Sequence, residues 1–492
     1  MRARTFQVVS FGCKVNQAEG ESLAARLRGQ GLEEAAAGRP ARLVIVNTCT
    51  VTGEAARQAR QCVRRAIRTG AAVVVTGCAA HPAAQDAALR AIPEVLFLEH
   101  DKERVGERIL QCGAPDAECG VSSVASLRDG TPDFAPPILH SSLPTHHSSL
   151  PRARALVKIQ DGCPASCAYC IVPKVRPAVR SLAPAEAAGR IEALVAAGCR
   201  EIVLCGIHLG LYGADLSRPA KGGSPSRVFD MPTPPLRGHV LFRDPEHAHG
   251  RSAVGMPPGQ GARPLLHDLI DRLLALPGRW RVRLSSLEPM EVSDALLARL
   301  AARPDRLCPH LHVPLQSGSD AVLERMGRPY TAGKFLAVVE RIRRALPRPA
   351  ITTDVLVGFP GETGADHGET LRVCREVAFS RIHVFPFSRR PGTRAAALRP
   401  EVPRAVLRAR GREVAALGEE LAARFRRDLV GSTAEVVVER LLPGGAAEGM
   451  SERYVRVRVA AGAMPGGRGG GLVTVRLARA AGGGLEGEAV PG

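Results

Sequence analysis

Three cysteines, Cys163, Cys167 and Cys170, lie on one short segment in the middle of the chain, directly after the apolar run 155–159. Three thiolates at this C-x3-C-x2-C spacing can each bind one iron of a 4Fe-4S cluster, which leaves the fourth iron without a cysteine. An open coordination position is typical of catalytic metal centres, whereas structural centres are closed. The spacing therefore predicts an iron–sulfur centre that takes part in chemistry.

A zinc site is the alternative interpretation of these three cysteines. A structural zinc site needs a fourth ligand, usually from a second Cys or His pair at short spacing. No such pair follows the loop at zinc-finger spacing. The iron–sulfur interpretation is therefore favoured.

The loop, with Tyr169 just before its last cysteine, resembles the signature of the radical S-adenosylmethionine (SAM) superfamily. In that superfamily the amine and carboxylate of SAM bind the iron that lacks a cysteine. Electron transfer from the cluster then splits SAM into methionine and a 5′-deoxyadenosyl radical. The resemblance implies SAM as a cofactor and Tyr169 as one of the residues that bind it.

Three further cysteines end apolar runs in the first hundred residues. These are Cys13, Cys49 and Cys78, and helical stretches follow them at 19–29, 54–68 and 83–91. Apolar strands that alternate with helices predict a parallel sheet covered on both faces. Sites in such sheets form at the carboxyl ends of the strands, so we expect the three thiols to converge. One such cysteine alone would be interpreted as a small buried side chain, which is how we interpret Cys62 and Cys205.

The residues around the second triplet resemble the N-terminal domain of the methylthiotransferases. The resemblance rests on Gly-Cys-Lys-Val-Asn-Gln at 12–17, Asn-Thr-Cys at 47–49 and Gly-Cys at 77–78. In that family three such cysteines bind a second 4Fe-4S cluster, which presents or carries the sulfur that is inserted. The resemblance thus implies two 4Fe-4S clusters, one for each cysteine triplet.

The segment Lys-Val-Asn-Gln at 14–17 resembles the branch of the family that acts on threonylcarbamoyladenosine in tRNA. The branch acting on isopentenyladenosine usually has Gln-Met-Asn here, and the branch acting on a ribosomal protein aspartate has Pro-Lys-Asn. The resemblance implies methylthiolation of adenine C2 at position 37, in the anticodon stem-loop. It also implies an electron donor such as flavodoxin or ferredoxin, and it leaves the catalytic side chains unknown.

Residues 154–397 predict a partial (β/α)6 barrel. Six strand-like runs alternate with helical stretches, at 154–159, 201–205, 281–284, 310–313, 351–356 and 381–385. In β/α barrels the chemistry lies at the carboxyl ends of the strands, which is where the cysteine loop follows the first strand. At the same edge the resemblance assigns SAM binding to Gly206, Ser286 and Gln316. The alternative is that they are polar caps of the strand ends.

The predicted fold class is α/β, with a parallel-sheet domain at 1–112, the barrel at 154–397 and a small β-barrel domain at 398–492. This last part begins with a basic helix, and short strands separated by glycine-rich turns follow it. It resembles the TRAM domain, an RNA-binding module, and a stabilising cap is the alternative. Arginines in this part supply cations for phosphates, namely Arg440, Arg453, Arg456, Arg458 and Arg476.

Two segments do not fit a packed domain. Residues 113–153 are rich in Ser, Pro and His, and we interpret them as a solvated linker rather than a metal-binding histidine tract. Residues 217–261 interrupt the barrel with many Pro and Gly, and we interpret them as surface decoration rather than a substrate grip.

The net charge of +19 favours a polyanionic partner, although almost all of the basic residues are arginine and part of the charge reflects composition. Aromatic residues are scarce, with 1 Trp and 4 Tyr, so a wide base-stacking surface is not expected. No apolar run approaches the ~20 residues that span a bilayer, and we expect a cytoplasmic enzyme without a membrane partner. The alternative from a different class is a non-catalytic iron–sulfur protein that binds RNA.

Overall fold

The computed structural model describes residues 5–36, 38–50, 53–84, 86–93, 95–98, 153–216, 265–461 and 471–490. The predicted linker, apart from Ala153, and the predicted insertion at 217–261 lie outside these residues, so both stay predictions. Within the described ranges, no helix has both the length and the hydropathy that a bilayer crossing requires.

The N-terminal part is a parallel sheet in the order β2-β1-β3-β4-β5. The three predicted strands are present as β1 (Thr5–Ser10), β3 (Leu43–Thr48) and β4 (Ala72–Gly77). Two short strands that the sequence did not predict, β2 (Glu33–Glu34) and β5 (Val95–Phe97), form the edges. Their length explains the omission, because neither is long enough to show a hydrophobic period.

Two of the three predicted helices of this part are regular, α1 (Lys14–Gly29) and α2 (Gly53–Arg68). The third was predicted at 83–91 and is wrong in extent. The chain there forms two 3-10 turns, η1 (Cys78–Ala80) and η2 (Pro82–Ala84), and one turn of helix, α3 (Ala87–Arg90). The Asp86 carboxylate accepts a hydrogen bond from the Leu89 N–H at 3.0 Å, and this cap starts the helix later than the sequence pattern suggested.

The central part contains the six predicted strands in chain order. They are β6 (Arg154–Asp161), β8 (Glu201–Gly206), β9 (Arg281–Leu284), β10 (His310–His312), β11 (Ala350–Val357) and β12 (Arg381–Pro386). The first three and the last three form separate parallel sheets, and the short β7 (Arg180–Ser181) extends the first sheet antiparallel to β6. A bridge between Ser286 and His312 links the two sheets, with the Leu287 N–H donating to the His312 carbonyl at 3.0 Å. This arrangement confirms the predicted partial barrel.

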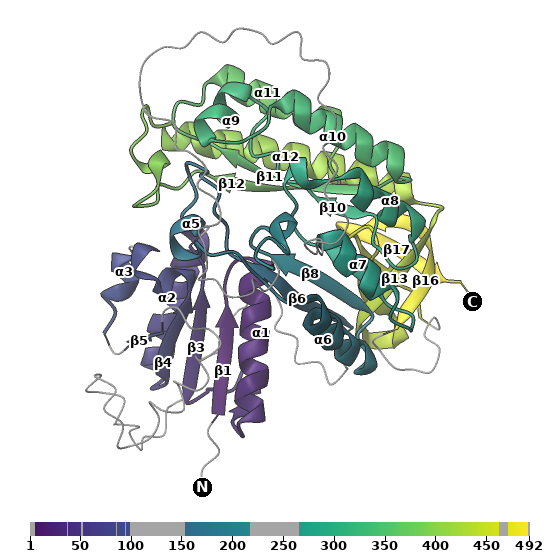
Figure 1. Ribbon diagram of the computed structural model, residues 1–492, viewed down its shortest axis with the longest axis horizontal. Coiled ribbons are helices and arrows are strands. Elements are labelled where there is room, and N and C mark those ends of the chain that lie inside the picture. The colour runs from purple at the N-terminus through teal and green to yellow at the C-terminus, as the bar shows by residue number, and fades with distance from the viewer. Residues whose placement is uncertain are drawn as a thin grey trace, which may run out of the picture.

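Helices cover one face of these two sheets (Figure 1). They are α6 (Pro184–Ala196), α7 (Leu266–Leu274), α8 (Asp294–Ala302), α9 (Asp320–Met326), α10 (Ala332–Ala345) and α11 (Gly364–Val377). Alternate strand residues such as Leu204, Leu284 and Val355 are buried in the core beneath them. Because side chains alternate along a strand, the residues between them lie on the other face, here called the inner face. The inner face carries polar side chains, among them Arg283 and His310.

The C-terminal part is a closed barrel in the order β13-β14-β15-β17-β16, as the sequence predicted. Its strands are β13 (Thr433–Leu441), β14 (Ala447–Ser451), β15 (Arg456–Val459), β16 (Leu472–Ala481) and β17 (Gly484–Ala489). β14 was not predicted, because Ala-Glu-Gly-Met-Ser lacks β-branched residues. Its Gly449 is needed for close packing, since a Cβ there would come within 2.1 Å of the Val437 carbonyl oxygen.

The basic helix, α12 (Arg404–Leu429), joins the central part to the C-terminal barrel. Its residues Val414, Leu417 and Leu421 belong to the core of the central part, and Gly418 packs against Ile382 of β12. Its last residue, Leu429, lies in the core of the C-terminal barrel. The helix therefore packs mainly as the covering helix of β12, although the sequence pattern grouped it with the strands that follow.

A buried carboxylate holds the C-terminal barrel against the amino ends of the central strands. Glu201 is fully buried and pairs with three arginines. Arg281 and Arg283 direct their remaining N–H groups to carbonyls of the C-terminal barrel, at 2.7–2.9 Å. Arg154 pairs with Glu439 of β13 at 2.6 Å. Burial alone would raise the pKa of Glu201, but the charges of Arg283, Arg154 and Arg281 outweigh it and hold the pKa well below its usual range.

Replacing Glu201 by Gln should strongly destabilise the protein, because it leaves buried guanidinium groups without their carboxylate. We expect the free energy of unfolding to fall by about 3–5 kcal/mol, measured by urea denaturation at neutral pH. The matched control is Glu186→Gln, which breaks an exposed pair with Arg190 on α6 and should cost less than ~1 kcal/mol. A loss for Glu201→Gln no larger than that of the control would contradict this account.

The difference in unfolding free energy between wild type and Glu201→Gln should depend on pH. The pKa of Glu201 is lower in the folded protein than in the unfolded chain, so its contribution is complete above roughly pH 5 and is lost as the pH falls. The difference in stability between wild type and Glu201→Gln should therefore narrow in acid.

Candidate functional site

The structure brings the N-terminal cysteines to one edge of the first sheet. Cys13 caps α1 after β1, Cys49 directly follows β3, and Cys78 begins η1 after β4. Because β1, β3 and β4 are parallel neighbours, their carboxyl ends lie side by side. A hydrogen bond from the Cys49 thiol is the main cause that lowers the pKa of Cys13 to about 6, against the opposing effect of burial. Cys13 is thus prepared to act as a thiolate at neutral pH.

Two glycines make this close approach of strand ends sterically allowed. Gly12 and Gly77, each directly before a cysteine, have φ of +92° and +91°. A Cβ at Gly12 would lie 2.3 Å from the Cβ of Cys49, and one at Gly77 would lie 2.3 Å from the Thr48 carbonyl oxygen. The Gly-Cys pairs therefore require glycine for both conformation and space.

The second triplet lies on the loop after β6, where Cys163, Cys167 and Cys170 follow one another. The Cys170 N–H donates to the Cys167 carbonyl at 3.1 Å, which folds the loop into a turn. Burial, together with the neighbouring thiols Cys167 and Cys163, raises the pKa of Cys170 to about 12. A bound iron would reverse this, because a coordinating thiol is deprotonated outright.

Basic side chains contact two sulfur atoms of this loop. The His208 Nδ1 lies 3.2 Å from the Cys163 Sγ, and Arg328 donates to the Cys167 Sγ at 3.2 Å. His208 also pairs with Glu291, and Arg328 with Glu288. Burial would lower the pKa of His208, but the hydrogen bonds to Cys163 and Glu291 outweigh it and raise the pKa to about 10. Both side chains are therefore cations that stabilise thiolate charge.

Each triplet fits an iron–sulfur cluster in the chemistry of its donors. Thiolates are the usual ligands of such clusters, and each thiolate binds a different iron. Within the residues that the structure describes, no group of three or more Cys, His, Asp or Glu side chains is arranged as ligands of a single ion.

Arg176 contacts both triplets. Its backbone carbonyl accepts a hydrogen bond from the Cys163 N–H at 3.0 Å, and its guanidinium donates to the Cys78 Sγ at 3.3 Å. The same guanidinium pairs with Glu19 of α1 and with Asp161 of β6, at 2.8 and 2.7 Å. Its side chain is only 8% exposed. The carboxyl ends of the two sheets thus meet at this residue, and Figure 1 shows α5 (Val172–Val175), just before it, beside the N-terminal sheet.

Sequence reasoning missed Arg176, and no signal in the sequence could have identified it. It follows the cysteine loop as one arginine among many. Only the folded chain brings its guanidinium to Cys78, 98 positions earlier.

The four residues predicted to bind SAM lie at the same end of the central strands as the cysteine loop. Gly206 ends β8, and a Cβ there would meet Gln160 at 2.7 Å, so the space that the glycine opens is taken by that side chain. Gln316 has a φ of +63°, a left-handed conformation that non-glycine residues adopt at a cost. Ser286 lies at the bridge between the two sheets. Tyr169 is packed beside Ala168 and Met326, and burial raises the pKa of its phenol well above its usual range.

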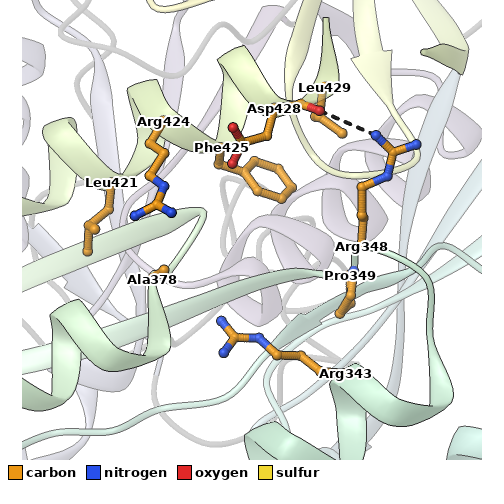
Figure 2. A pocket seen from close by; sticks show the side chains of 9 residues that line it. All are labelled: Arg343, Arg348, Pro349, Ala378, Leu421, Arg424, Phe425, Asp428 and Leu429. Carbon is orange, nitrogen blue, oxygen red and sulfur yellow. Dashed lines mark hydrogen bonds between the residues drawn. The ribbon is translucent and has the colours of Figure 1, made fainter. Parts of the chain in front are cut away.

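A cavity of about 340 Å³ lies at the other end of the central part (Figure 2). Its lining includes Arg343, Arg348 and Arg424, near the amino end of β11 and the last turns of α12. The six cysteines lie at the carboxyl ends of strands, so this cavity is not part of their site.

Comparisons with known proteins agree with this geometry. Residues 157–374 match the radical SAM superfamily, and residues 5–98 match a family described as uncharacterized protein family UPF0004. A solved structure of the radical SAM methyltransferase TsrM from Kitasatospora setae has a TM-score of 0.50 and 14% identity, covering 80% of this chain and 75% of its own. Fold and cysteine loop together define a radical SAM enzyme.

Curated relatives cover almost all of the chain. A threonylcarbamoyladenosine tRNA methylthiotransferase, MtaB, of Thermotoga maritima is 31% identical, over 92% of this chain and 91% of its own. A tRNA-2-methylthio-N6-dimethylallyladenosine synthase of Nocardia farcinica is 32% identical, over 98% and 88%. This chain therefore belongs to the radical SAM tRNA methylthiotransferases, enzymes that use SAM and two 4Fe-4S clusters.

The iron content of variants should show that each cysteine triplet binds its own cluster. Anaerobically reconstituted wild-type protein should bind about eight irons per chain, and Cys→Ala replacement of either complete triplet should leave about four. Cys62→Ala is the control, because that thiol lies in α2 with a pKa raised to about 11 by burial and should not affect iron binding. Iron and labile sulfide assays measure this, and only four irons in the wild-type protein would contradict the account of two clusters.

Proposed function

We propose that this enzyme adds a methylthio group to adenine C2 of N6-threonylcarbamoyladenosine at position 37 of tRNA. The names of the relatives support tRNA as the substrate, but they include enzymes for two different modified adenosines at similar identity. The choice between the two bases therefore needs support from the site itself.

The observation that carries the proposal is the contact of Arg176 with both cysteine triplets. Cys163, Cys167 and Cys170 would hold one cluster, and Cys13, Cys49 and Cys78 the other. When bound, the two clusters supply the cleavage of SAM and the sulfur that is transferred. A base between the two triplets would be within reach of both, as an enzyme that activates a carbon and then adds sulfur to it requires.

The protein itself orients the reactants and excludes water. The ion network of Arg176 with Glu19 and Asp161 fixes the two cysteine-bearing edges relative to each other. Ile171 and Val175 pack with Cys78 in a buried apolar cluster beside this network. Tyr169, Gly206, Ser286 and Gln316 remain our proposed SAM-binding residues, because they share the carboxyl-end edge with the cysteine loop.

The polar inner face favours threonylcarbamoyl over dimethylallyl as the group on N6 of the adenine. The threonylcarbamoyl group has a carboxylate, a hydroxyl and an amide, whereas the dimethylallyl group is a hydrocarbon. The inner face holds charged and polar side chains such as Arg283, His312 and Asp354. Burying a hydrocarbon against them would remove their hydration without replacing it.

The C-terminal barrel is proposed to hold the anticodon stem-loop. Arg456 and Arg458 point outward from β15, and Arg476 from β16, on the two strands that flank β17. Exposed cations on two strands of one barrel wall suit contacts with phosphates, although Arg456 also pairs with Glu448.

The proposal also includes an electron donor such as flavodoxin or ferredoxin and a cytoplasmic location, where tRNA is modified.

Nucleoside mass spectrometry of tRNA tests this function. A deletion strain should lose 2-methylthio-N6-threonylcarbamoyladenosine and accumulate the unmethylthiolated nucleoside. The wild-type gene should restore the product, and a Cys163→Ala variant should not, because that loop would lack a cluster ligand. Loss of 2-methylthio-N6-dimethylallyladenosine (the isopentenyladenosine product) instead, or no change in either nucleoside, would overturn the proposal.

A further inference from the structure

We infer that Lys14 binds the carboxylate of the acidic group on N6 of the substrate base, in a site that Tyr454 of the C-terminal barrel completes. This inference rests on the proposed function and names the residue that would select the acidic substrate.

Lys14 lies beside the Tyr454 ring, and its ammonium has no ionic partner among the described residues. It is the first residue of α1, next to Cys13, and its Nζ lies 5.4 Å from the centre of the Tyr454 ring. Among the described residues, no carboxylate pairs with it and no acceptor hydrogen-bonds to it. Lys158 nearby differs, because it pairs with Glu19 and Asp161 at 3.0 and 3.1 Å.

Tyr454 is held in place by all three parts of the chain. It lies in the turn between β14 and β15 with a φ of +60°, a conformation that persists only where the surroundings enforce it. Its ring stacks on the His310 ring with 4.7 Å between centroids and an angle of 29°. The Arg283 guanidinium carbon lies 5.0 Å from the ring centre. The C-terminal barrel thus contributes a side chain to the inner face.

Two buried polar atoms of the inner face lack a hydrogen-bond partner among the described residues, His310 Nδ1 and Ser285 Oγ. His310 is 1% exposed and Ser285 is 4% exposed. His310 uses its other ring nitrogen for the Thr352 hydroxyl at 3.1 Å, which leaves Nδ1 available. Buried polar groups are almost always hydrogen-bonded, so each of these two atoms needs an ordered water or a polar ligand atom as its partner.

Among the residues described, other charged side chains of the inner face are paired with one another, whereas the ammonium of Lys14 is not. Glu201 neutralises part of the charge of Arg154, Arg281 and Arg283, and Asp354 pairs with His312 at 3.3 Å. A carboxylate on the ligand would pair with the Lys14 ammonium, and its neighbouring hydroxyl and amide suit His310 and Ser285. A hydrocarbon group would cover the partly exposed ammonium without pairing with it.

The position of Lys14 agrees with the position of the reacting atom. C2 and N6 belong to the same adenine base, so a base whose C2 faces the cysteines has its N6 substituent close by. Lys14 follows Cys13 directly and extends from there toward Tyr454. Its side chain therefore extends from the reaction centre to the group that distinguishes the substrates.

Binding of synthetic anticodon stem-loops tests the inference with the reconstituted full-length protein. The loops carry either N6-threonylcarbamoyladenosine or its methyl ester, and the measurement is Kd by fluorescence anisotropy at fixed salt. Wild type should bind the acid about tenfold more tightly than the ester, since the ester cannot form the charge-assisted pair. Lys14→Gln should bind both equally, with unchanged iron content. Lys334→Gln, on the exposed side of α10, is the matched control and should behave as wild type.

Equal binding of acid and ester by wild type would overturn the inference without any variant. A Lys14→Gln protein that still prefers the acid would overturn it as well. Lys14→Met, which keeps the aliphatic stem, replaces Lys14→Gln if that protein fails to hold its iron. The proposed function fails separately, if wild type binds and modifies the dimethylallyl stem-loop in preference to the acid.

Discussion

The site depends on one buried guanidinium, that of Arg176. It links an N-terminal sheet edge to the cysteine loop of the central part, through Cys78 and Glu19 on one side and Asp161 on the other. Burying these charges is costly, and the cost is offset only when every donor has an acceptor. The guanidinium of Arg176 finds acceptors on both parts, on Glu19 and Cys78 of the N-terminal part and on Asp161 of the central part. This salt-bridge network thereby joins the two sheet edges that carry the cysteine triplets.

Glu201 has the same function at the opposite end of the central strands. Two of its three arginines, Arg281 and Arg283, donate to carbonyls of the C-terminal barrel, and the third, Arg154, pairs with Glu439. The ring of Tyr454 lies against His310 of the inner face. The C-terminal barrel thus contributes the Tyr454 ring to the inner face of the central part. The substrate base would then contact side chains from three parts of one chain.

The sequence predicted the features that repeat or that lie close together in the chain. The cysteine loop, the six central strands and the three strands ending in Cys13, Cys49 and Cys78 were all visible as local patterns. It did not predict the residues that join the parts, because Arg176, Glu201 and Tyr454 have most of their partners far away in the sequence and no local pattern of their own. Short elements such as β14 were missed for another reason, since packing at Gly449 and not side-chain preference makes them strands.

The central claim is that the two triplets hold clusters close together across the contact at Arg176. Electron paramagnetic resonance of the reduced, fully reconstituted protein tests this most directly, because two nearby paramagnetic clusters interact through their spins. The account predicts a broadened or split spectrum that differs from the sum of the spectra of two variants, each lacking one triplet. A wild-type spectrum equal to that sum would show two isolated clusters and would contradict the account.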